Sequence, residues 1–94
     1  SNEPGYYEEG AYGIRIENVV LVEPPKAIAG GDRDMMSFET LTLAPIDRRL
    51  IVTQALSAAE RDWLNAYHVR VYEGLSPKLD EAARRWLKAA TAEI

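Results

Sequence analysis

The amino-acid sequence predicts an α+β fold, with antiparallel strands in the first half of the chain and a two-helix hairpin in the second. Two observations lead to this prediction. Residues 14–23 (IRIENVVLVE) and 35–44 (MMSFETLTLA) are rich in Ile, Val, Thr and Phe, and both stretches are followed by proline. After residue 56, apolar residues instead recur at helical spacing behind a Ser-Ala-Ala-Glu capping signal.

Turn signals separate the strands of the first half. Proline follows both long strands, and it ends a strand because it has no N–H to donate to a neighbour. The two long strands are expected to pair as an antiparallel hairpin across a polar, glycine-rich loop. In chain order, the expected elements are a short strand at 6–7, a turn at 10–13, a strand at 14–23, a loop at 30–34, a strand at 35–44 and an edge segment at 46–52.

The second half predicts two amphipathic helices. Ser57 and Glu60 have the spacing of a capping box that opens the first helix, and Gly74 marks its expected end. The second helix is expected to open at Asp80, or at Ser76 ahead of Pro77. The apolar positions of the two helices are Trp63, Leu64, Tyr67 and Val71, then Leu79, Ala83, Trp86, Leu87, Ala90 and Ile94.

Composition narrows the functional classes. The chain has 94 residues, a length typical of one small domain, and its net charge of −4 disfavours a nucleic-acid partner. It contains no cysteine, which excludes disulfides and Cys-based zinc sites and fits a reducing compartment. Because no apolar stretch approaches the ~20 residues of a membrane span and no leader is visible, we expect a cytoplasmic location and no membrane partner.

A carboxylate interrupts the apolar run of the strand at 14–23. Side chains alternate faces along a strand, so Arg15 and Glu17 share one face while Ile14 and Ile16 share the other, which is expected to face a core. One interpretation is a half-exposed strand with a cross-strand ion pair. The other is a metal site, because carboxylates bind hard cations, although two are too few for a dinuclear centre. The single histidine, His68, is more often a packed residue than a ligand at such a helical position.

Residues 1–22 (SNEPGYYEEGAYGIRIENVVLV) resemble the last two metal-ligand segments of the pita-bread metallopeptidases, most of all the long Xaa-Pro aminopeptidases (aminopeptidase P). In that family one Glu lies in an E-P-G-Y-Y turn and the next in a G-I-R-I-E-N strand. Here these are Glu3 and Glu17. The stretches FETLTLAPIDRRLI and ERDWLNAYHVRV resemble the extension that follows the catalytic core. The resemblance implies that residues 1–52 end a pita-bread (creatinase/aminopeptidase) catalytic domain and that residues 53–94 are a C-terminal helical extension.

The resemblance also implies an activity. The family uses two divalent metals, usually Mn²⁺, and a metal-activated water to hydrolyse the N-terminal Xaa-Pro bond of peptides that have proline in second position. Glu17 would bridge the metals, Glu3 would bind one metal and serve as general acid/base, and Arg15 would orient a carboxylate ligand. Gly5 and Gly13 would supply tight turns. The other ligands would precede the first residue, so the chain is expected to be the C-terminal piece of a longer enzyme, inactive and without metal by itself.

An alternative is that the chain is a non-catalytic structural or dimerisation module of a pita-bread protein. Large aromatic side chains dominate interface energetics, so Trp63, Tyr67 and Trp86 are the candidate anchors. The family resemblance implies a homodimer. A non-catalytic relative usually loses its metal-binding carboxylates, and the retention of Glu3 and Glu17 favours the enzyme interpretation.

Overall fold

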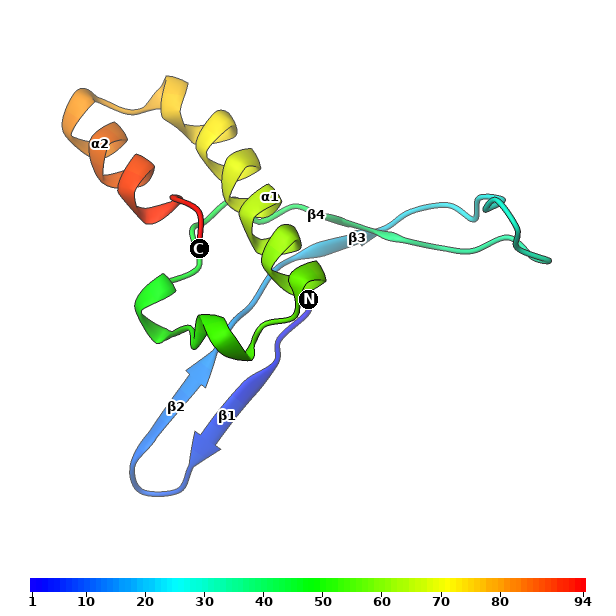
Figure 1. The fold of residues 1–94 in the computed structure, drawn as a ribbon, viewed down its shortest axis with the longest axis horizontal. Helices are drawn as coiled ribbons and strands as arrows, with labels where there is room; N and C mark the ends of the chain where they lie inside the picture. Colours follow the sequence, from blue (N-terminus) through cyan, green and yellow to red (C-terminus); the bar gives the residue numbers. More distant parts are fainter. The chain divides into compact units, whose positions relative to one another are not determined.

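In the computed structural model, which describes residues 1–94, the chain forms two compact units, residues 1–42 and 43–94. The first holds four strands and the second holds two helices, as the α+β prediction requires (Figure 1). In order, the elements are β1 (Gly5–Glu8), β2 (Tyr12–Arg15), β3 (Val20–Val22), β4 (Phe38–Thr40), the 3₁₀ turns η1 (Arg48–Leu50) and η2 (Thr53–Ala55), α1 (Ala58–Leu75), the 3₁₀ turn η3 (Ser76–Lys78) and α2 (Glu81–Ala90).

The first unit consists of two antiparallel hairpins, β1–β2 and β3–β4. The β1–β2 turn is centred on Gly10, whose φ of 71° lies in the left-handed region that favours glycine. The N–H of Ala11 closes this turn by donating to the carbonyl of Glu8 at 3.1 Å. The turn therefore comes earlier than the expected position at 10–13, and Gly13 already belongs to β2.

The strand predicted at 14–23 is divided into β2 and β3. Its two halves have different partners: β2 pairs with β1, whereas β3 pairs with β4. Between them, the N–H of Val19 donates to the Thr42 hydroxyl at 2.8 Å instead of to a ladder carbonyl. The expected core face is also wrong within this unit, since Ile14 and Ile16 are 41% and 44% exposed.

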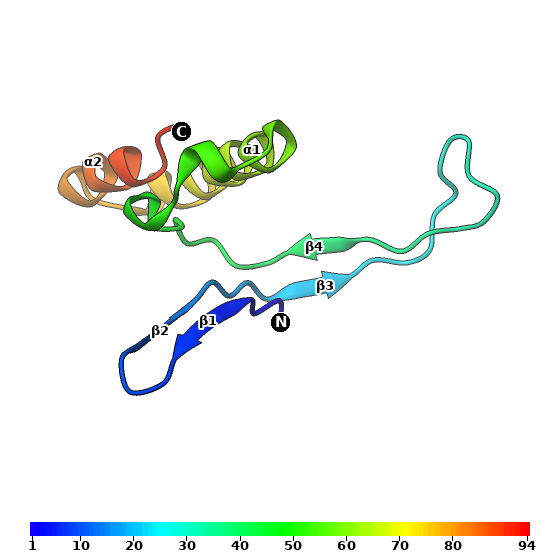
Figure 2. The ribbon, with the colours of Figure 1, turned by 60° about the horizontal axis from the view of Figure 1, so that its bottom comes forward.

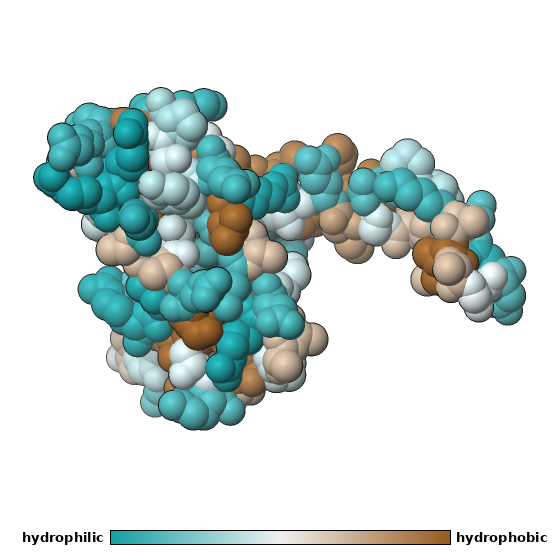
Figure 3. Space-filling view, turned by 45° about the horizontal axis from the view of Figure 1, so that its top comes forward, coloured by the Kyte–Doolittle hydropathy of each residue, from teal (hydrophilic) through white to brown (hydrophobic).

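The β3–β4 hairpin continues beyond its strands as a long arm (Figures 1 and 2). Lys26 and Met35 exchange two backbone hydrogen bonds of 2.9 Å, and the N–H of Glu23 donates to the Ser37 carbonyl at 2.9 Å. The pairing of residues 14–23 with 35–44 is thus confirmed, although the regular part is short. Hydrophobic groups lie exposed along the arm (Figure 3), among them Ile28, Met35, Met36 and Phe38.

The second unit contains all the buried residues, which are Leu64, Tyr67, His68, Val71 and Leu87. Four of them lie on α1 and one on α2, so the predicted helical stripes form the core of this helix hairpin only in part (Figure 2). Trp63 and Trp86, which were expected in the stripes, are 52% and 63% exposed. Partly buried Leu43, Ile46, Ile51, Leu56, Tyr72, Leu75, Leu79 and Ile94 pack against it. Neither helix has the length and apolar composition needed to cross a bilayer.

Local signals set the helix starts. Ser57 Oγ accepts from the Glu60 N–H and the Glu60 carboxylate accepts from the Ser57 N–H, so the predicted capping box is present. Asp80 caps α2 by accepting from the Ala83 N–H at 2.8 Å. Gly74 does not end α1, which continues to Leu75.

Two differences from the expected elements have identifiable local causes. A Cβ built on Gly74 would lie 3.0 Å from Leu43 Cδ1, so this glycine allows close packing rather than a helix stop. The edge segment expected at 46–52 contains the η1 turn instead. Its cap is Asp47, whose carboxylate accepts from the Arg49 N–H at 3.0 Å.

Candidate metal centre

The β1–β2 register places the two candidate ligands directly opposite each other. Gly5 pairs with Arg15, and the same register continues to the bridge between Asn2 and Asn18, which exchange hydrogen bonds of 2.8 and 3.0 Å. Glu3 therefore faces Glu17 across the hairpin. This position lies next to a hydrogen-bonded pair and is itself non-hydrogen-bonded, which is where opposed side chains come closest.

The two carboxyl groups lie within hydrogen-bond reach of each other. This contact is the main cause that lowers the pKa of Glu3, followed by a hydrogen bond with the Ser1 side chain. Slight desolvation acts in the opposite direction, and the charges of Arg15 and the N-terminal amine help to lower the pKa. Like charges directly opposite each other on neighbouring strands are unfavourable unless a cation or a shared proton joins them. The pair is therefore suited to binding a cation.

Arg15 forms an ion pair with Glu17, with Nε 3.4 Å from Oε2. Both side chains are largely exposed, at 54% and 42%. This pair joins two residues of one strand segment, whereas the sequence predicted an ion pair across strands. The residue that faces Glu17 across the hairpin is Glu3. An exposed ion pair of this kind contributes little to stability. Its main effect is to orient the carboxylate of Glu17.

A side chain that the sequence interpretation missed shares this face. The ring of Tyr7 lies over Gly5 and Gly13, since a Cβ built on either glycine would fall 2.7 Å from an atom of that ring. Both glycines are needed for this close approach, within paired strands, rather than for the tight turns that were expected. Period-two alternation from Glu3 could have placed Tyr7 on this face.

The donor set fits part of a metal centre. Carboxylate oxygens suit hard and borderline divalent cations. No group of three or more His, Cys, Asp or Glu side chains comes together anywhere in the chain. Glu3 and Glu17 could therefore supply two ligands, but a dinuclear centre needs others. The prediction that His68 is a packed residue agrees with its complete burial.

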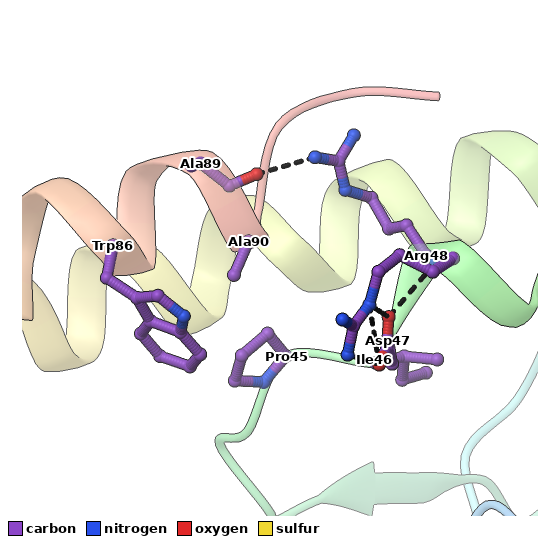
Figure 4. A pocket seen from close by; sticks show the side chains of 8 residues that line it. Pro45, Ile46, Asp47, Arg48, Trp86, Ala89 and Ala90 are labelled. Carbon is purple, nitrogen blue, oxygen red and sulfur yellow. Dashed lines mark hydrogen bonds and ion pairs between the residues drawn. The ribbon is translucent and has the colours of Figure 1, made fainter.

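The second unit contains a groove of about 530 Å³ beside α2 (Figure 4). Arg48 crosses its end and donates to the carbonyls of Ala89 and Glu93, at 2.6 and 3.3 Å. The Arg49 guanidinium binds Asp47 through both carboxylate oxygens and lowers the pKa of that carboxyl to about 2. The lining residues are Pro45, Ile46, Asp47, Arg48, Arg49, Trp86, Ala89 and Ala90. The lining holds a single carboxylate, Asp47, which is already bound by Arg49.

Comparison with solved structures identifies the class of protein. The crystal structure of an X-prolyl aminopeptidase from Caenorhabditis elegans, described as a cytosolic enzyme with a di-nuclear active site, matches with a TM-score of 0.83 and 32% sequence identity. The match covers 98% of this chain and 16% of that one. The fold is therefore that of the end of a pita-bread metallopeptidase.

Residues 34–94 match the family described as the C-terminal region of peptidase M24, and the chain belongs to that family. It is 47% identical, over its whole length, to a protein named probable Xaa-Pro aminopeptidase P from Tuber melanosporum. It is 46% identical to aminopeptidase P1 from Lotus japonicus. The chain spans 16% and 15% of the lengths of these two relatives.

Proposed function

We propose that this chain supplies the C-terminal part of a dinuclear-metal Xaa-Pro aminopeptidase, with Glu3 and Glu17 as two of the metal ligands. The observation that carries the proposal is the direct opposition of these two carboxylates across the hairpin. The names of the relatives, together with their identity over the whole chain, support the reaction class. By this proposal residues 1–52 end the catalytic domain and residues 53–94 form the helical extension.

The roles of the chain's own residues follow from their positions. Glu3, whose pKa is lowered, stays ionised at neutral pH and can bind a cation or accept a proton. Glu17 contacts both Glu3 and Arg15; it would hold the cations together with Glu3, and Arg15 would orient its carboxylate. When bound, two divalent cations supply an activated water nucleophile and stabilise the developing oxyanion.

The finer parts of the proposal concern metal, substrate, assembly and location. An all-carboxylate contribution is compatible with Mn²⁺, which we propose as the metal. The substrates are peptides with proline in second position, as the relatives' names suggest. We further propose a cytoplasmic homodimer, supported by the cytosolic neighbour and by the exposure of Trp86 at 63%.

Replacing Glu17 with Gln in the full-length protein tests the ligand assignment. The change keeps the size of the side chain but removes its charge, so we expect loss of bound metal and a fall of more than about 100-fold in kcat/KM, beyond the range for outer-shell residues. Metal content is measured by mass spectrometry and turnover on a Xaa-Pro peptide with Mn²⁺. Glu9→Gln, in the exposed turn, is the matched control. Unchanged metal content in the Glu17 variant would reject the role.

A further inference from the structure

Two consecutive side chains of α1 hold the segment that leads into η1. Tyr67 Oη donates to the Ala44 carbonyl at 2.9 Å and accepts from the Ala44 N–H at 3.4 Å. His68 Nε2 accepts from the Ile46 N–H at 3.0 Å. Pro45 lies between these residues and has no N–H. Both backbone donors of residues 44–46 therefore bond to side chains rather than to a strand.

The bond to Ile46 fixes the protonation state of His68. An imidazole nitrogen that accepts a hydrogen bond must carry a free lone pair, so in the neutral ring the proton is on Nδ1. The ring is completely buried, and Nδ1 has no hydrogen-bond partner. A protonated ring is a donor at both nitrogens. Its Nε2–H would then point at the Ile46 N–H, and the bond that holds the segment would be lost.

The charges around His68 favour the neutral ring. Burial is the main cause that lowers its pKa, and the positive charge of Arg48 is the second. Asp47 stays ionised throughout the relevant pH range, but its carboxylate is bound by Arg49. Tyr67, on the same helix, has its ring centroid 5.9 Å from the imidazole. The other buried side chains of this unit, Leu64, Val71 and Leu87, are apolar.

We propose that His68 is an acid-sensitive latch, in which proton uptake on Nε2 releases residues 44–49 from α1. The released segment carries Arg48, so the carbonyls of Ala89 and Glu93 at the end of α2 would lose their guanidinium donor. It also forms one wall of the groove, which would open with it (Figure 4). This device is separate from the proposed metal ligands, and its test does not depend on catalysis.

The direction of the pH dependence follows from linkage. The closed state binds fewer protons on His68 than the released state, whose imidazole has an ordinary pKa of about 6.5. The closed state therefore has its full stability above pH ~6.5 and loses it as the pH falls through the lowered pKa of the buried ring. The positive charge of Arg48 adds repulsion once the ring is protonated, which favours release.

Hydrogen–deuterium exchange of the full-length protein at pH 7.5 and pH 5, corrected for intrinsic exchange rates, tests the latch. We expect peptides from residues 44–52 and from the end of α2 to lose protection at pH 5 relative to pH 7.5, because the released state binds the proton more tightly. His68→Gln keeps an acceptor that does not titrate, so its protection should not change between the two pH values. His68→Leu should be unprotected in these peptides at both.

Three results would overturn the proposal. The first is equal protection of residues 44–52 in the unmodified protein at both pH values. The second is a His68→Gln variant that loses as much protection at pH 5 as the unmodified protein does. The third is a loss of protection at pH 5 throughout the chain rather than in these peptides. If the variants do not fold, the ¹⁵N shifts of His68 in the unmodified protein decide the matter. An imidazole that carries its proton on Nε2 at neutral pH would contradict the latch.

Discussion

The hydroxyl of Tyr67 provides a test of one interaction at the residue scale, because it bonds to both backbone polar groups of Ala44. Tyr67→Phe removes the hydroxyl but keeps the ring, which stacks on Trp63 with centroids 5.4 Å apart. Loss of a partly buried hydrogen bond typically costs about 1 kcal/mol. We expect the free energy of unfolding of the chain, measured in urea, to fall by about that amount.

Tyr72→Phe is the matched control for that experiment. Tyr72 packs against the same core but is only partly buried. Its replacement should change the free energy of unfolding much less, because no hydrogen bond within the chain involves its hydroxyl. Equal losses in the two variants would mean that the bonds to Ala44 contribute nothing specific.

The candidate site shows which roles of single residues can be predicted from the sequence and which need the structure. Glu3 and Glu17 were selected by motif, and the shared face of Arg15 and Glu17 followed from strand alternation. The direct opposition of Glu3 and Glu17 does not follow from the sequence, because a turn at 10–13 gives a register different from the one observed. Gly13 is the reason for the difference: glycine indicates a turn in the sequence, but here it makes room for the ring of Tyr7 within a strand.

At the scale of an element, α1 depends on its first turn. Ser57→Ala removes the hydroxyl that accepts from the Glu60 N–H and breaks the capping box. Replacing an N-cap serine with alanine costs about 0.5–2 kcal/mol. We expect the thermal midpoint of the helical unit to fall accordingly, measured by circular dichroism at 222 nm. Ser76→Ala, whose side chain caps nothing, is the control, and an equal fall there would contradict the role of the box.

Elements set by local signals were predicted well, whereas those set by distant partners were not. The capping box and Asp80 act within three residues, so both helix starts are visible in the sequence. The break between β2 and β3 depends instead on a change of pairing partner, from β1 to β4. The sequence near Asn18 contains no proline or glycine that would indicate the end of a strand there. The end of α1 differs from the prediction for a similar reason. Gly74 lies inside the helix and allows the side chain of Leu43 to approach closely.

At the scale of the whole molecule, burial is unevenly distributed between the two units. Every buried residue belongs to residues 43–94, whereas the hydrophobic side chains of the hairpins, such as Tyr6, Tyr12, Leu21 and Phe38, are about half exposed or more. The chain spans about one sixth of its relatives' length. Short strands whose apolar side chains are mostly exposed open more easily than a packed helix pair. The unit that carries the proposed ligands is therefore expected to be the less stable of the two in this 94-residue chain.

Limited trypsin digestion of the 94-residue chain tests this asymmetry. Lys26 and Arg33 lie on the exposed arm, and their side chains are 62% and 80% accessible. Cleavage requires local opening, which needs little free energy where no backbone is packed in a core. We therefore expect mass spectrometry to find the first cuts after Lys26 and Arg33, and later a resistant product that contains both helices. Arg70, within α1, is the internal reference, and cleavage there before the arm is cut would show that the helical unit is not the stable part.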